Sequence, residues 1–222
     1  MFALQHSAKH KIASNYGKSY YPSDYSPNAG WADYYGNEDF FKAYPNDDRK
    51  EWNYMTEWKI KSGEIIPYTE SADKLPAISK YYDYDEGAPG KSAQSNGITC
   101  IYRYAEVLLM YAEASTRATN SVNQDALNAI QEVQKRAGYQ DRQIELTTTT
   151  EPTAFLTAVS NERGWEFFAE MKRWFELVRL EKVKEVRAEE WDASTFNTNH
   201  HYYFPVPYQQ VDLAGWTNNA GY

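Results

Sequence analysis

The feature that most constrains this chain is the stretch from Asn161 to Arg179, where charged and aromatic residues recur at helical spacing. On a helix of about 3.6 residues per turn, residues three or four positions apart share a face, and opposite charges on that face can pair. The aromatic and aliphatic residues fall largely on other faces. A helix that is ionic on one side and apolar on another is expected inside a folded protein. The charged face consists of Arg163, Glu166, Glu170 and Arg173.

Two interpretations of this charged face compete. Glu162, Glu166 and Glu170 could be acid and base catalysts, because two carboxyl groups several ångströms apart can divide these roles. Alternatively, they pair with Arg163 and Arg173 in a network that fixes helix packing, since long charged side chains are seldom buried unless paired. A general acid needs a raised pKa, whereas an arginine within helical reach lowers the pKa of each carboxyl group. We therefore favour the structural network.

The same stretch resembles the C-terminal signature of the SusD/RagB family, the surface glycan-binding lipoproteins of the Bacteroidetes, with its ER..E...E..RW.DL.R pattern. Met171 stands where many members carry glycine, and Glu176 stands where most carry aspartate. Residues 103–114 resemble the RyAEvlLmyAEA motif of the family, and residues 135–138 resemble its vR.RAG motif. Residues 202–222 are similar to its fPIP..Ei...NpGY ending, which implies that the chain stops at its native terminus.

Composition bears on the kind of partner. A net charge of -8 and a pI near 5.1 argue against nucleic acid, whose phosphates need a basic surface. Aromatic residues make up 16% of the chain. A flat ring can cover the apolar face of a sugar while hydroxyl and amide groups bind its rim. The composition therefore suits a sugar-binding surface, although a tyrosine-rich core would also explain it.

The single cysteine and the N-terminal residues argue against a disulfide, a zinc site and a signal peptide in this chain. Cys100 has no partner for an internal disulfide and cannot form a zinc site alone, so we expect a buried structural thiol. No run approaches the ~20 apolar residues of a membrane span. Residues 1–8 lack the pattern of a signal peptide. They resemble the FAIQYS-type strand midway through SusD-like proteins, which implies that the N-terminal half of the family, with its lipobox, is absent here.

We expect residues 1–97 to form a loop-rich aromatic lobe with short strands, and residues 98–222 to form a helical region continuous with it. Many glycines and prolines interrupt the first part. Ser62 and Gly63 lie between two strand-like runs, which predicts a short hairpin. Asp48 and Arg49 belong to a segment that resembles the Y..nD.R element of the family, and we interpret them as hydrogen-bonding residues that lock a loop.

The densest aromatic cluster lies in residues 25–36. Gly30 and Gly36 allow the backbone to turn where side chains would clash, so that one loop can present several rings. A glycan platform would use Trp31 and a tyrosine for stacking, with an amide or carboxylate at the sugar hydroxyls. Alternatively, the rings only pin the loop to the helices. The candidate ligand-binding residues are Trp31, Tyr34, Tyr35, Tyr25, Asn28 and Asp33.

Apolar residues repeat at helical spacing over residues 101–115 and again over residues 126–137, which predicts two antiparallel helices in a hairpin of tetratricopeptide type. Asn123 or Ser121 is expected to cap the second helix, and Gly138 is expected to end it.

A third helix is expected to start near Thr150, as its N-cap, and to run into the stretch at residues 161–179. His200 and His201 invite a metal-site interpretation. Adjacent histidines on an extended segment point to opposite sides, however, so we expect no metal site.

The expected fold class is therefore mainly α and SusD-like, with tetratricopeptide-type hairpins and an aromatic lobe. The resemblance implies a non-catalytic protein of the outer-membrane cell surface that binds an oligosaccharide or polysaccharide and delivers it to a SusC-like TonB-dependent transporter. Its membrane attachment would be only the lipid anchor of the absent part. No nucleophile elbow or phosphate loop occurs, and we expect no cofactor. Three alternatives stay open: a peptide-binding relative, a scaffold for the transporter, and a glycoside hydrolase using Asp33 and Asp48.

Overall fold

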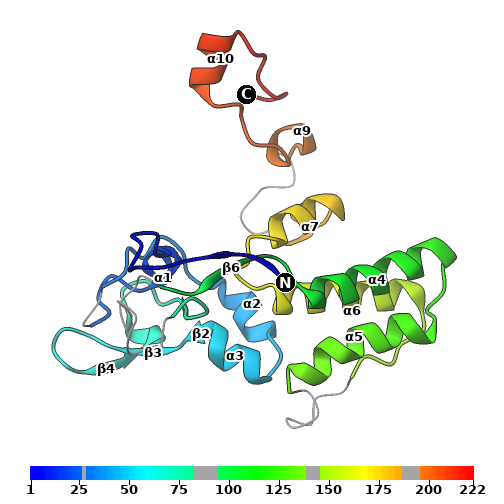
Figure 1. Ribbon diagram of the computed structural model, residues 1–222, viewed down its shortest axis with the longest axis horizontal. Coiled ribbons are helices and arrows are strands. Elements are labelled where there is room, and N and C mark those ends of the chain that lie inside the picture. Colours follow the sequence, from blue (N-terminus) through cyan, green and yellow to red (C-terminus); the bar gives the residue numbers. More distant parts are fainter. Residues whose placement is uncertain (27–28, 83–94, 139–145, 187–195) are drawn as a thin grey trace. The chain divides into compact units, whose positions relative to one another are not determined.

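The computed structural model describes residues 1–26, 29–82, 95–138, 146–186 and 196–222. They form two compact units, Met1–Glu170 and Met171–Tyr222, and all the described strands belong to the first unit (Figure 1). The domain boundary expected at residue 97 lies inside the first unit. None of the helices in the described ranges is both long and apolar enough to cross a membrane.

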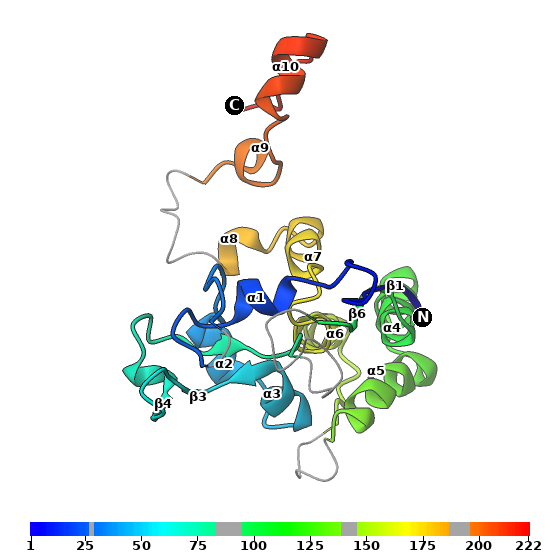
Figure 2. The ribbon, with the colours of Figure 1, turned by 60° about the vertical axis from the view of Figure 1, so that its left-hand side comes forward.

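Three helices of the first unit, α4 (Tyr104–Thr119), α5 (Gln124–Arg136) and α6 (Pro152–Glu166), pack side by side (Figure 2). The predicted hairpin of α4 and α5 is confirmed. Asn123 is the N-cap of α5, and its side-chain oxygen accepts from the Ala126 N–H at 2.8 Å. Burying one large aliphatic or aromatic side chain here stabilises the fold by about 1.5–3 kcal/mol. The buried core consists of Leu109, Ala112, Ala126, Ala129, Ile130, Val133, Phe155, Val159 and Phe167.

The start of α6 differs from the expectation. Its N-cap is Glu151, whose carboxylate accepts from the Thr153 and Ala154 N–H groups at 3.0 and 2.6 Å. Thr150 as the cap was therefore wrong. The longer glutamate side chain reaches these two donors, and a negative charge at a helix N-terminus is favourable.

The ionic stretch at residues 161–179 is not one helix. α6 ends at Glu166, and α7 (Arg173–Arg179) begins after a turn. Within the turn, Ala169 and Met171 adopt the left-handed conformation, with φ of 57° and 60°. A residue with a side chain pays a steric cost in this region, which is why glycine suits such positions. The glycine that many family members carry at position 171 was the sequence signal for this break.

The rest of the first unit is a loop-rich lobe with three two-stranded antiparallel sheets. The predicted hairpin is confirmed by the pairing of Trp58 with Ile66, and Gly63 in its turn has a φ of 94°. The paired strands are β1 (Phe2–Gln5) with β6 (Ile98–Tyr102), β2 (Tyr54–Met55) with β5 (Ala77–Ile78), and β3 (Glu57–Lys59) with β4 (Ile65–Pro67). The short helices are α1 (Tyr16–Tyr20), α2 (Glu38–Ala43), α3 (Asp48–Asn53) and the 3-10 turn η1 (Tyr68–Glu70).

Cys100 lies on β6, and the expectation of a buried thiol was wrong. It is only partly buried, because β6 pairs with β1 alone in a sheet of two strands. Its Sγ lies 3.5 Å from the sulfur of Met1.

The second unit holds α7, α8 (Val183–Val186), α9 (Thr198–His201) and α10 (Tyr208–Ala214). Its tail folds back, because the hydroxyl of Tyr222 donates to the carbonyls of His200 and Tyr203, at 3.1 Å each. The imidazole of His200 also stacks on the Tyr222 ring, with ring centroids 4.2 Å apart. The expected extended segment at the two histidines was wrong, since His200 and His201 end a helical turn.

We predict that Met171→Gly raises the free energy of unfolding by about 0.5–1 kcal/mol. Glycine relieves a backbone strain of about 1–2 kcal/mol at this left-handed position. Part of this gain is lost, because glycine also increases the conformational entropy of the unfolded chain. The Met171 side chain is 54% exposed, so little packing is lost. Urea unfolding measures the change. Met110→Gly, at a half-exposed position inside α4, is the matched control and should lower stability by about 1 kcal/mol. A loss of stability in both variants would contradict the prediction.

Candidate functional site

The segment at residues 29–36, called the aromatic loop below, runs back along α1 and is fixed to it by main-chain hydrogen bonds. The Trp31 N–H donates to the Lys18 carbonyl at 2.6 Å, and the Asp33 N–H donates to the Ser19 carbonyl at 2.9 Å. The Ala32 N–H donates to the Tyr21 carbonyl at 3.0 Å. Each such bond contributes about 1 kcal/mol, and together they define the loop conformation without using its side chains.

Two glycines permit this close approach. A Cβ atom on Gly30 would lie 2.0 Å from the Tyr21 carbonyl oxygen, and one on Gly36 would lie 2.5 Å from the ring of Tyr54. Neither glycine has a positive φ, so the backbone needs their lack of a side chain and not their conformational freedom.

The loop exposes three of the candidate ligand-binding residues. Trp31 is 53% exposed and Tyr34 is 61% exposed, and Asp33 between them is also exposed. Ala32 has a φ of 56°, which changes the direction of the chain after Trp31. The ammonium group of Lys18 lies 5.1 Å from the centre of the Trp31 ring. The exposed surface thus combines two rings, a carboxylate and an ammonium group.

Two other candidates, Tyr35 on the loop and Tyr25 before it, are held by their own hydroxyl groups. The hydroxyl of Tyr35 donates to Asp73 at 2.7 Å, and burial together with this bond raises the pKa of Tyr35. The hydroxyl of Tyr25 lies 3.4 Å from that of Tyr82. Both side chains are half-buried, so their rings offer less surface than those of Trp31 and Tyr34. Asn28 lies outside the residues that the structure describes.

Further tyrosines, which the sequence did not single out, support Tyr34 from behind. The ring of Tyr20 lies 5.8 Å from that of Tyr34 and is stacked on Tyr81 at the same distance, and Tyr16 is 5.1 Å from Tyr81. The spacing of Tyr16 and Tyr20, four residues apart on a helical turn, was the available signal. Aromatic pairs at these distances contribute about 0.5–1.5 kcal/mol each beyond burial.

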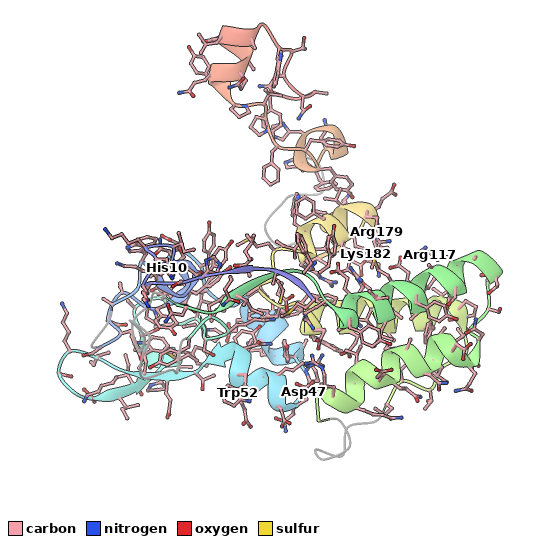
Figure 3. All side chains as sticks on the ribbon, viewed as in Figure 1. His10, Asp47, Trp52, Arg117, Arg179 and Lys182 are labelled. Atoms are coloured by element: carbon pink, nitrogen blue, oxygen red, sulfur yellow. The ribbon has the colours of Figure 1, made fainter. Side chains whose placement is uncertain are left out.

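A second cluster, the ion network, centres on Glu166 at the end of α6. Arg49 contacts Glu166 and Glu162 through the same Nη1, at 2.9 and 2.6 Å. Glu166 also pairs with Arg103 and Arg136, which come from the start of α4 and the end of α5. Arg49 in turn pairs with Asp47, the N-cap of α3, at 2.7 Å. Figure 3 labels Asp47 and, within the same helix, Trp52.

The ion network continues through Glu170. Its carboxylate pairs with Arg103 at 2.8 Å and with the ammonium group of Lys80 at 2.7 Å. Lys80 also donates to the carbonyl of Phe168 at 2.9 Å. Every carboxylate in this cluster is therefore hydrogen-bonded to a cation.

The partners expected from helical spacing were Arg163 and Arg173. The Nη2 atom of Arg163 lies 4.0 Å from Glu106, and the guanidinium group lies over the Phe167 ring. In the second unit, Arg173 bonds to Glu176 at 3.0 Å. The arginines that contact Glu166 come from positions 30 to 117 residues away, although each belongs to a motif already recognised in the sequence.

The charges decide what this cluster can do. Burial opposes ionisation of Glu166 and Glu170, but the cations around them lower the pKa of both carboxyl groups below the ordinary value. Glu162 differs, because burial raises its pKa against the effect of Arg49. Ionised carboxylates that accept from arginines are poor general acids. A structural role therefore fits Glu166 and Glu170 better than proton transfer.

Asp33 and Asp48, the pair considered for hydrolysis, have different surroundings. Asp33 lies on the aromatic loop. The backbone N–H of Asp48 donates to the Ala137 carbonyl at 3.3 Å, and its carboxylate lies against Gly138, which has a φ of 84°. Asp48 thus joins α3 to the end of α5, as expected of a residue that locks a loop.

Comparison with known proteins identifies the family. The profile of the SusD family matches residues 12–222, so the chain belongs to this family. The SusD-like protein P2 of Formosa agariphila is 28% identical over 200 residues, which are 82% of this chain and 39% of that protein.

Two solved structures share the fold. A SusD superfamily protein from Parabacteroides distasonis superposes with a TM-score of 0.77 and 23% identity, over 100% of this chain and 50% of that one. Surface glycan-binding protein A from Bacteroides uniformis gives a TM-score of 0.68 and 23% identity, over 99% of this chain and 48% of that one. The expected mainly α, SusD-like fold is confirmed. The chain spans about half the length of these structures, and less of protein P2.

We predict that Glu166→Gln lowers the free energy of unfolding by about 3 kcal/mol, because it leaves two largely buried arginines, Arg49 and Arg103, and the exposed Arg136 short of a negative charge. Glu132→Gln, at an exposed position on α5, is the control and should change stability by less than about 0.5 kcal/mol. Urea unfolding compares the two. Equal effects of the two substitutions would show that the ion network does not stabilise the fold.

A second prediction concerns pH. The folded-state pKa of Glu170 lies below the ordinary value of 4.5, so its stabilising effect is complete above that value and is lost as the pH falls through the folded pKa. Between pH 5 and pH 3, stability should therefore fall less steeply in Glu170→Gln than in the unsubstituted chain. Urea unfolding at a series of pH values, with Glu132→Gln alongside, measures the slopes. If stability falls equally steeply with pH in Glu170→Gln and in the unsubstituted chain, the lowered pKa of Glu170 is refuted.

Proposed function

We propose that this chain is a non-catalytic glycan-binding part of a cell-surface protein, and that Trp31, Tyr34 and Asp33 form its binding platform. The observation that carries the proposal is the exposure of both rings on a loop that main-chain hydrogen bonds already hold in place. Tyr25, Tyr35 and Asn28 are proposed to contribute further ligand contacts.

The physical argument rests on stacking and on rigidity. An exposed indole or phenol ring can cover the apolar face of a pyranose, while Asp33 accepts hydrogen bonds from sugar hydroxyls. Binding is weakened by the entropy lost when a mobile loop becomes ordered. The bonds from the aromatic loop to α1 fix the loop beforehand, so this cost is small.

Family membership supports a sugar as the ligand. One protein of the same fold is named a surface glycan-binding protein, and it aligns with nearly all of this chain. By the same resemblance, the complete protein would lie at the outer-membrane surface, held by a lipid anchor outside this chain, and would pass its glycan to a SusC-like TonB-dependent transporter. The pairing of the Glu166 and Glu170 carboxylates with cations supports binding without hydrolysis.

We predict that Trp31→Ala weakens glycan binding about ten- to a hundredfold, because a stacking ring in a binding site contributes about 1–3 kcal/mol. Calorimetric titration with a panel of soluble plant, host and microbial oligosaccharides and polysaccharides measures the affinity. Trp52→Ala is the matched control: Trp52 is 64% exposed on α3, outside the platform, and its loss should leave the affinity unchanged.

The same samples separate the alternatives. Release of reducing ends would indicate a hydrolase, and binding of peptides but not sugars would indicate a peptide-binding relative. Binding of neither by the folded chain would favour a scaffold for the transporter. Binding that is lost in Trp52→Ala and kept in Trp31→Ala would place the site elsewhere and refute the proposed platform.

A further inference from the structure

Lys18 is tied to the proposed platform in two ways. Its carbonyl accepts the Trp31 N–H at 2.6 Å, and its ammonium group lies 5.1 Å from the centre of the Trp31 ring. The first contact fixes the backbone of the two residues together. The second places a positive charge over the ring that the proposed function uses for stacking.

This charge has no counter-ion within the part of the chain that the structure describes. Other lysines pair there, such as Lys42 with Glu38 at 3.0 Å, but no salt bridge involves Lys18. Asp33 is on the same loop, yet it does not approach Lys18 closely enough to form one. The ammonium group of Lys18 is therefore available to an anion from outside.

Two other carboxylates, those of Asp24 and Asp73, already accept hydrogen bonds from other side chains. Asp24 accepts from the indole N–H of Trp58 at 2.8 Å, and Asp73 accepts from the Tyr35 hydroxyl at 2.7 Å. Neither carboxylate forms a salt bridge with Lys18 within the described ranges. The net charge of -8 does not decide the local balance, because charges more than about 8 Å apart are largely screened at physiological ionic strength.

We infer that the platform selects an acidic glycan, in which a carboxylate or sulfate group on the sugar stacked at Trp31, or on its neighbour, pairs with Lys18. This inference rests on the proposed function. A lysine suits the role because its ammonium group is a compact charge on a flexible four-carbon chain, which can swing from the ring to an anion at the rim of the sugar. Asp33 remains available for hydroxyl groups.

The test compares acidic polymers with their own neutral forms. Polygalacturonate and its carboxyl-reduced form are one pair, and a sulfated galactan and its desulfated form are the other. We expect the chain to bind one acidic form about three- to tenfold more tightly than its neutral form, as one partly exposed ion pair allows. The two pairs distinguish carboxylate from sulfate.

Variants assign this preference to Lys18. Lys18→Gln should abolish the preference for the acidic form over the neutral form, whereas Lys18→Arg should keep this preference. Lys61→Gln, at an exposed lysine in the β3–β4 turn, is the control and should keep it too. Thermal unfolding of each variant checks the fold, and Lys18→Gln retains the carbonyl that binds Trp31.

The outcomes separate this inference from the proposed function. Equal or tighter binding of the neutral forms, lost in Trp31→Ala, would overturn the acidic preference and leave the platform intact. A preference that survives in Lys18→Gln would also overturn the role of Lys18. Binding of neither form, with no effect of Trp31→Ala on any glycan, would refute the proposed function and this inference with it.

Discussion

The first unit depends on the burial of one carboxylate. Glu166 is 2% exposed and is contacted by guanidinium groups from α3, from the residue before α4, and from α5. A buried charge destabilises a protein by several kcal/mol unless it is paired and hydrogen-bonded, so these segments have to meet at the end of α6. The ion network thereby connects the loop-rich lobe to the helical hairpin, two parts that share little apolar core.

The sequence predicted best what depends on neighbouring residues. Helical spacing was sufficient for α4 and α5, and Ser62-Gly63 was sufficient for the β3–β4 hairpin, because the interactions that form these elements span a few residues. It predicted least well where a local preference is overridden. Met171 has a side chain in a left-handed position, so the glycine that would mark the turn after α6 is missing from this chain.

The candidate site was predictable in composition but not in arrangement. Glycine and aromatic residues marked the aromatic loop, yet no pattern shows which rings face outward. The arrangement follows from pairings of residues distant in sequence, such as Tyr35 with Asp73 and Trp58 with Asp24, which anchor the loop and its neighbours and leave Trp31 and Tyr34 exposed. For the same reason, helical spacing suggested Arg163 as the partner of Glu166, while Arg49, Arg103 and Arg136 approach from other elements.

The ion network and the platform are joined by two consecutive residues. Lys80 pairs with Glu170 in the network, and Tyr81 donates to the Ala169 carbonyl while its ring stacks on Tyr20. Tyr20 then supports the exposed ring of Tyr34. In the proposed function, the ion network thus contributes to binding by position, since a stacking ring binds a sugar well only if its support is rigid. This continuity gives a physical reason why the ionic signature and the aromatic loop, which are far apart in the sequence, would both serve the proposed binding site.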